Sequence, residues 1–86
     1  MISAEKIRSL GKDKILDMLN NPPSLKENTP EVYLYIDLCS IYYRYCVDAN
    51  HGFVHFEGTE YEDRVNNPRK HAAEFVERLL NGEFGV

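Results

Sequence analysis

The central third of the chain, residues 29–52, constrains the fold most, because it is largely apolar and its polar side chains recur at helical intervals. Asp37, Ser40, Arg44 and Asp48 are separated by three, four and four residues. That spacing predicts an α-helix and not a strand, whose faces alternate every two residues. At about 100° per residue the four positions fill one stripe roughly 80° wide.

The rest of this predicted helix is apolar around most of its circumference. Its hydrophobic residues are Val32, Leu34, Tyr35, Ile36, Leu38, Cys39, Ile41, Tyr42, Tyr43, Tyr45, Cys46 and Val47. Such a helix has to be covered on most sides, and a chain of 86 residues has little other material to cover it. The sequence therefore predicts that a second copy or a partner protein shelters part of this helix.

Boundary signals predict where the helices begin. Thr29 and Pro30 combine a cap with a proline at the first helical position and so start the central helix. Further helices are predicted on either side of it. Gly11 is expected to weaken the first of them at its middle, where either a bend or a close helix contact would account for a glycine. Thr59 and Glu62 have the spacing of a capping box, and Asn67 followed by Pro68 combines a cap with a proline at the first helical position. We expect an all-α fold in a single domain of residues 1–86, with helices at about 4–19, 30–49, 60–65 and 68–80.

An alternative applies to the end of the central helix. Tyrosine and β-branched residues favour strands, so residues 42–48 could instead pair with residues 53–57 as a hairpin. In the helical interpretation, Phe53 and Phe56 belong to an extended segment that closes one end of the core.

Charge and cysteine usage narrow the class of protein. The formal net charge of −4 disfavours nucleic-acid binding, which depends on many Lys and Arg contacts to phosphate. Cys39 and Cys46 are about 10.5 Å apart along the predicted helix, too far for a disulfide. Free thiols, and an N-terminus without the apolar run of a secretory signal, predict a cytoplasmic location. Asp37, Arg44 and the tyrosines make the central helix unsuited to spanning a membrane.

Metal and catalytic sites have weak support in the sequence. Cys46, His51, His55 and Glu57 include every ligand type that zinc accepts, but their spacing matches no recognised zinc motif. The same histidines, or His71 at the edge of the C-terminal helix's apolar face, would be the acid–base groups of a small hydrolase. No glycine-rich phosphate loop or nucleophile constellation is present in the sequence. We therefore predict no enzymatic activity, no cofactor and no metal.

Tyrosines on the central helix are the most promising functional signal. Tyrosine is enriched at interfaces because its ring gives a large contact area and its hydroxyl tolerates water, although the same rings would also fill an aromatic core. The predicted partner-binding residues are Tyr33, Tyr35, Asp37, Tyr42, Arg44 and Tyr45.

These observations predict a non-enzymatic, small acidic protein-binding module, a regulator or inhibitor of a larger protein, that acts as a homodimer. Its acidic surface would suit a partner with a basic site, because complementary charge speeds encounter. The alternative is a nucleic-acid-associated transcriptional regulator whose helices at about 60–65 and 68–80 mimic a helix-turn-helix. A histidine-dependent hydrolase is the third interpretation.

Overall fold

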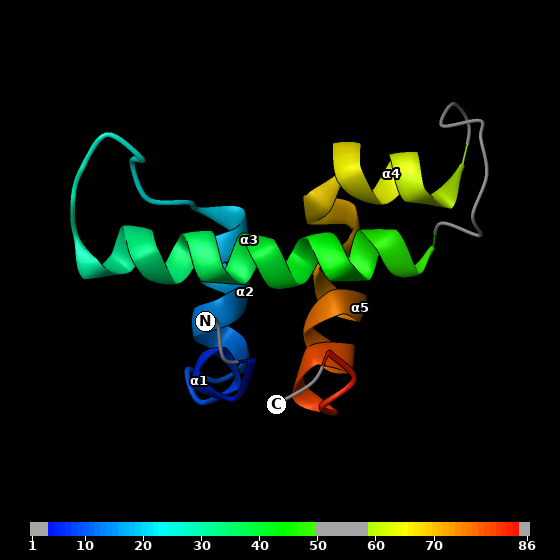
Figure 1. The fold of residues 1–86 in the computed structure, drawn as a ribbon, viewed down its shortest axis with the longest axis horizontal. Helices are drawn as coiled ribbons and strands as arrows, with labels where there is room; N and C mark the ends of the chain where they lie inside the picture. The colour runs from blue at the N-terminus through cyan, green and yellow to red at the C-terminus, as the bar shows by residue number, and fades with distance from the viewer. Residues whose placement is uncertain (1–3, 50–58, 85–86) are drawn as a thin grey trace.

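Five α-helices make up the regular structure of the described residues, which are 4–49 and 59–84 of a computed structural model, and no strand occurs among them. The helices are α1 (Ala4–Arg8), α2 (Lys12–Asn20), α3 (Pro30–Asp48), α4 (Glu60–Asn66) and α5 (Pro68–Leu80). The predicted all-α fold, with a long central helix packed by the others, is confirmed. In Figure 1, α3 runs across the molecule, α2 and α5 cross it steeply, and α4 lies along its C-terminal half.

The single N-terminal helix predicted at 4–19 is wrong at its centre, because the structure divides it at Gly11 into α1 and α2. Gly11 has φ 87° and ψ 161°, a backbone conformation that is open essentially to glycine alone. Its carbonyl accepts from the amide of Ile15 and so starts α2 in a new direction. The break places both Ile7 of α1 and Ile15 of α2 in the core, each with no exposed surface.

The start of α3 agrees with its sequence signals. The hydroxyl of Thr29 accepts a hydrogen bond from the amide of Val32 at 3.3 Å, and Pro30 is the first helical residue. The helix continues through Asp48, so the alternative hairpin is wrong for residues 42–48. Residues 53–57, its second strand, lie outside the described part of the chain.

The inner face of α3 packs into a core that α1, α2 and α5 complete. Tyr42 lies edge-on to Phe75 of α5, with ring centroids 5.0 Å apart, and Tyr45 lies edge-on to Phe84 at 6.2 Å. Aromatic pairs prefer such tilted geometries because the ring edge is positive and the face is negative. The largest fully buried side chains are Tyr45, Phe75, Ile7, Ile15, Leu38, Ile41, Leu79, Val76 and Cys46.

Arg64 fastens α4 to the C-terminal end of α3. Its side chain is buried, and its Nη1 donates to the backbone carbonyl of Tyr45 at 2.8 Å. The last four carbonyls of a helix have no partner within the helix, so Arg64 satisfies one of them from a neighbouring element. In return, the hydroxyl of Tyr42 donates to the backbone carbonyl of Arg64 at 2.6 Å. These reciprocal bonds fix the position of α4 against α3.

Candidate protein-interaction surface

The outward face of α3 carries a continuous row of exposed, mainly apolar residues. We call this row the outer seam; it consists of Tyr33, Ile36, Ser40, Tyr43 and Val47. The fractional exposure of its hydrophobic members is 58% for Tyr33, 48% for Ile36, 56% for Tyr43 and 42% for Val47. Successive members are three, four, three and four residues apart, which is the spacing of the contact positions of a coiled coil. The seam is therefore a helix surface of the kind that packs against another helix.

Polar atoms on the outer seam already have partners within the chain. The hydroxyl of Ser40 donates to the carbonyl of Ile36, one turn back, at 3.2 Å. The hydroxyl of Tyr33 donates to the side chain of Asn28, and the hydroxyls of Tyr43 and Tyr61 are 3.4 Å apart. A buried polar group costs free energy only where it lacks a hydrogen bond. Covering the seam would therefore leave none of these hydroxyls unsatisfied.

Charged residues border the seam on one side and α4 borders it on the other. Asp37 and Arg44 lie on the same edge of α3, where Asp37 is partly buried and Arg44 is exposed. The Nη1 atom of Arg44 donates to the carbonyl of Phe84 at 3.1 Å, which holds the side chain along the surface. On the α4 side, Tyr61 approaches the seam through Tyr43. The seam is thus an apolar strip between a charged edge and an aromatic neighbour.

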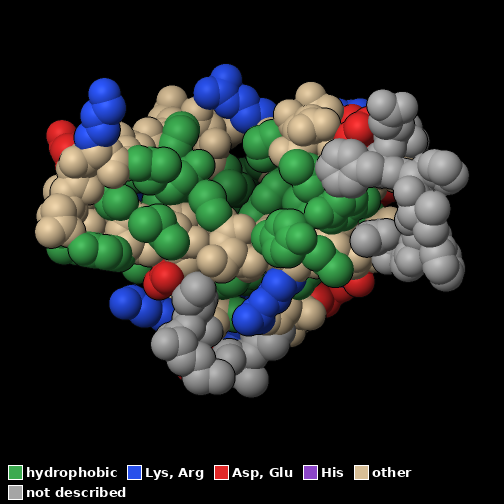
Figure 2. Space-filling model, turned by 45° about the horizontal axis from the view of Figure 1, so that its top comes forward, with side chains coloured by type: hydrophobic (Ala, Val, Ile, Leu, Met, Phe, Trp, Pro, Cys, Tyr) green, Lys and Arg blue, Asp and Glu red, His purple; other side chains and the backbone are tan. Residues whose placement is uncertain are grey.

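Figure 2 shows the distribution of side chains over this side of the molecule. Hydrophobic side chains gather across its middle, and Lys, Arg, Asp and Glu lie mostly around its margin. An apolar centre within a polar rim is the usual anatomy of a protein–protein interface. Isolated exposed apolar residues are ordinary on protein surfaces, whereas a contiguous group of them indicates an interaction site.

The structure separates the six residues predicted to bind a partner. Tyr33 lies on the outer seam, and Asp37 and Arg44 lie at its edge. Tyr35 is partly buried and packs against the core, away from the seam. Tyr42 and Tyr45 belong to the core, with exposures of 8% and 0%. Their rings are covered by the chain's own helices, so the candidate surface does not include them.

The sequence interpretation omitted four seam residues, which are Ile36, Ser40, Tyr43 and Val47. The signal that would have found them is the alternation of three- and four-residue steps through positions 33, 36, 40, 43 and 47. The outer seam lies directly beside the polar stripe that contains Asp37 and Arg44. The exposed face of α3 is therefore wider than the polar stripe alone.

Titratable groups on the inner face of α3 are held in their neutral forms. Burial raises the pKa of Tyr35 to about 12, and burial also raises the pKa values of Tyr42, Tyr45 and the Cys46 thiol. Removing water from around these groups disfavours their anions. They therefore remain protonated near neutral pH and supply no nucleophile to the surface.

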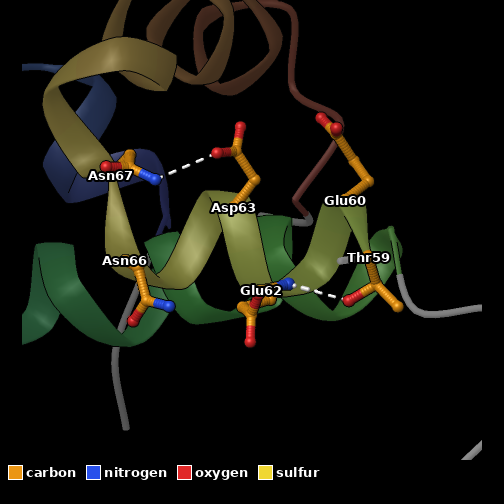
Figure 3. A pocket seen from close by; sticks show the side chains of 6 residues that line it. All are labelled: Thr59, Glu60, Glu62, Asp63, Asn66 and Asn67. Carbon is orange, nitrogen blue, oxygen red and sulfur yellow. Dashed lines mark hydrogen bonds between the residues drawn. The ribbon is translucent and has the colours of Figure 1, made fainter. Parts of the chain in front are cut away.

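A polar hollow beside α4 has a structural explanation. It is lined by Thr59, Glu60, Glu62, Asp63, Asn66 and Asn67, and Figure 3 shows these side chains projecting from one helix and its caps. The Thr59 hydroxyl accepts from the amide of Glu62 at 3.1 Å, and Asn67 donates to Asp63 at 2.9 Å. Three carboxylates in this hollow would repel a phosphate group.

His71 is engaged in the same region. Its ring is buried, and its Nε2 lies 2.6 Å from the Oδ2 of Asp63, which also accepts from Lys70 at 2.8 Å. The lysine and the histidine lower the pKa of Asp63 to about 2. His51, His55 and Glu57 lie outside the described residues. Within residues 4–49 and 59–84, no group of three or more His, Cys, Asp or Glu side chains is arranged to hold a metal ion.

Comparisons with known proteins give no relative: no family model, curated protein or solved structure matches the chain. Among the helices that the structure describes, none combines the length and the apolar character needed to cross a membrane.

Proposed function

We propose that this chain is a non-enzymatic protein-binding module, a small regulator or inhibitor of a larger protein, that self-associates as a homodimer through the outer seam. The observation that carries the proposal is the seam itself, an exposed helix face whose apolar residues keep coiled-coil spacing. The internal bonds of its three hydroxyl groups lower the cost of covering it.

The size of the seam indicates a dimer of moderate affinity. Complete burial of a Val, Leu, Ile or Phe side chain contributes about 1.5 to 3 kcal/mol, and each of the four hydrophobic seam residues has roughly half of its surface left to bury. Over two copies this amounts to roughly 6 to 12 kcal/mol, to be set against an association cost of about 4 to 15 kcal/mol. The two ranges overlap, so we expect an equilibrium that depends on protein concentration.

The negative charge of the chain supports a basic partner for the regulatory role. A net charge of −4 attracts a positively charged surface and speeds the encounter with it. We propose that this partner binds surfaces away from the seam, because the second copy would occupy the seam itself.

The helix-turn-helix alternative gains no specific support. The basic residues at the start of α5 are already engaged, since Arg69 donates to the carbonyl of Asn20 at 3.1 Å and Lys70 pairs with Asp63. The neighbouring helix α4 presents Glu60 and Glu62, which would meet phosphates unfavourably. The hydrolase interpretation depends on His51 and His55, whose positions the structure does not describe.

Sedimentation equilibrium over a wide concentration range tests the proposal. We expect the wild-type chain to pass from monomer to dimer, and the double variant Ile36→Gln, Val47→Gln to dimerise at least about tenfold more weakly. The matched control is Leu25→Gln, because Leu25 is 65% exposed but lies outside the seam. A wild-type chain that stays monomeric at every concentration would contradict the proposal. So would a dimer that the control Leu25→Gln weakens as much as the double variant does.

A further inference from the structure

We infer that the two copies meet antiparallel along the outer seam, in the register that sets Asp37 of each copy opposite the partner's Arg44. The inference rests on the proposed function, because it specifies how the seam is covered. Two features of α3 support it: the opposite charges of Asp37 and Arg44 at the edge of the seam, and the side-chain sizes along the seam.

Asp37 and Arg44 lie nearly symmetrically about the centre of the outer seam, which runs from Tyr33 to Val47. Each lies three and a half residues from the midpoint between Ser40 and Ile41, so they are about 10.5 Å apart along the helix axis. A two-fold axis that crosses α3 between Ile41 and Tyr42, one residue from that midpoint, reverses the helix direction and brings each Asp37 to within about 3 Å, along the axis, of the partner's Arg44. Both copies of Asp37 would then lie opposite an arginine of the other copy, which gives two ion pairs from one symmetric contact.

Other arrangements lose these pairs. In a parallel, in-register dimer each residue lies at the level of the same residue in the partner. The two Asp37 carboxylates would then lie side by side, and so would the two Arg44 guanidinium groups. An antiparallel register that sets Ile36 beside the partner's Ser40 brings Asp37 to the partner's Asp37. Like charges at such positions disfavour association. The edge charges therefore favour one orientation and one register.

Side-chain sizes along the seam favour the same register. With Asp37 facing the partner's Arg44, the small Ser40 lies at the level of the partner's Tyr43, and Ile36 lies at the level of the partner's Val47. A large residue opposite a small one fills the space between two helices without overlap. The hydroxyl of Ser40 is already bonded to Ile36, so a tyrosine ring packed over it breaks no hydrogen bond.

Arg44 has the capacity for this contact. It is exposed, and its bond to Phe84 uses one of the five N–H donors of the guanidinium group. The remaining donors are sufficient to bind a carboxylate.

Cysteine cross-linking tests the orientation directly. The variants are made in a Cys39→Ser background. In the antiparallel register, position 47 of one chain lies about 16 Å along the axis from position 47 of the partner, beyond the reach of a disulfide. We expect Val47→Cys alone to give no covalent dimer, and a mixture of Ile36→Cys and Val47→Cys chains to cross-link. Covalent dimers of Val47→Cys alone would show a parallel arrangement and overturn the inference while leaving the proposed function standing.

Charge exchange tests the register. We expect Asp37→Arg and Arg44→Asp each to weaken the dimer about tenfold, and the two changes in one chain to restore it. Glu77→Arg, an exposed charge reversal on α5, is the matched control and should leave the dimer unchanged. A dimer that forms but shows no recovery in the double variant would overturn the register alone. Absence of any wild-type dimer would overturn the proposed function as well.

Discussion

The guanidinium group of Arg64 lies over the ring of Tyr45, with its central carbon 3.9 Å from the ring centroid, while its Nη1 donates to the Tyr45 carbonyl. One side chain thus stacks on the core and satisfies the end of α3. The charge is balanced at the surface, because Nε donates to Glu60 at 3.2 Å and Glu74 lies 3.9 Å from Nη2. The C-terminal turn of the helix that carries Val47 depends on this contact.

Arg64→Ala should therefore destabilise the fold. It removes a cation–π contact and a charge-assisted hydrogen bond to a helix-terminal carbonyl, which together contribute about 2 to 4 kcal/mol. Arg69→Ala, which removes an exposed guanidinium with a bond to Asn20, should cost less than about 1 kcal/mol. Urea denaturation measures both, and equal effects of the two substitutions would contradict the role of Arg64.

The buried and exposed tyrosines of α3 should respond differently to loss of their hydroxyls. Tyr42→Phe leaves the buried carbonyl of Arg64 without its 2.6 Å donor, at a cost of about 1 to 2 kcal/mol. Tyr43→Phe removes an exposed 3.4 Å contact and should be close to neutral. The difference in free energy of unfolding between the two variants is the measurement. A larger loss in Tyr43→Phe would show that the inner and outer faces of α3 are wrongly assigned.

Gly11 should resist substitution because of its backbone and not because of its surroundings. A Cβ added there meets no atom within 4 Å, so Gly11→Ala probes only the φ of 87° at a cost of about 1 to 3 kcal/mol. Gly82→Asn is the comparison, since Asn tolerates positive φ after a helix. Thermal unfolding should show a drop of at least about 4 °C for Gly11→Ala and a smaller one for Gly82→Asn. An unchanged midpoint in Gly11→Ala would mean that the break between α1 and α2 is not strained.

Asp63 should contribute to stability in a defined range of acid pH. Hydrogen bonds from Lys70 and His71 lower its pKa from 3.8 to about 2, so the unfolded chain takes up a proton first as the pH falls. The contribution is complete above about pH 4 and is lost between about pH 4 and pH 2. Asp63→Asn should lack this part of the pH dependence, whereas Asp13→Asn, on the exposed first turn of α2, should retain it. Identical acid unfolding curves for both variants would contradict the assignment.

Local sequence signals predicted most helix boundaries. The caps at Thr29 and Thr59 and the prolines Pro30 and Pro68 act within one helical turn, so their effects can be read without knowing the tertiary structure. The break at Gly11 was harder to foresee, because glycine in a helix is tolerated at modest cost and the left-handed φ depends on where α1 and α2 pack.

The candidate surface was predicted only in outline. The sequence indicated that α3 has more apolar surface than a small chain can cover, but it did not show which side stays open. Tyr42 and Tyr43 are adjacent and identical in chemistry, yet one is 8% exposed and the other 56%. Their difference arises from the positions of α4 and α5, which no single-residue property reveals. The buried Arg64 was missed for the same reason.

The most direct test of the central claim is an isotope-filtered NOE experiment on a mixture of labelled and unlabelled chains at a concentration that favours the dimer. Such an experiment detects only contacts between different molecules. We predict intermolecular NOEs from the Tyr43 ring to the partner's Ser40, and from the Ile36 methyl groups to the partner's Val47. Intermolecular NOEs confined to other surfaces, or none at any concentration, would contradict the claim that a second copy covers the outer seam.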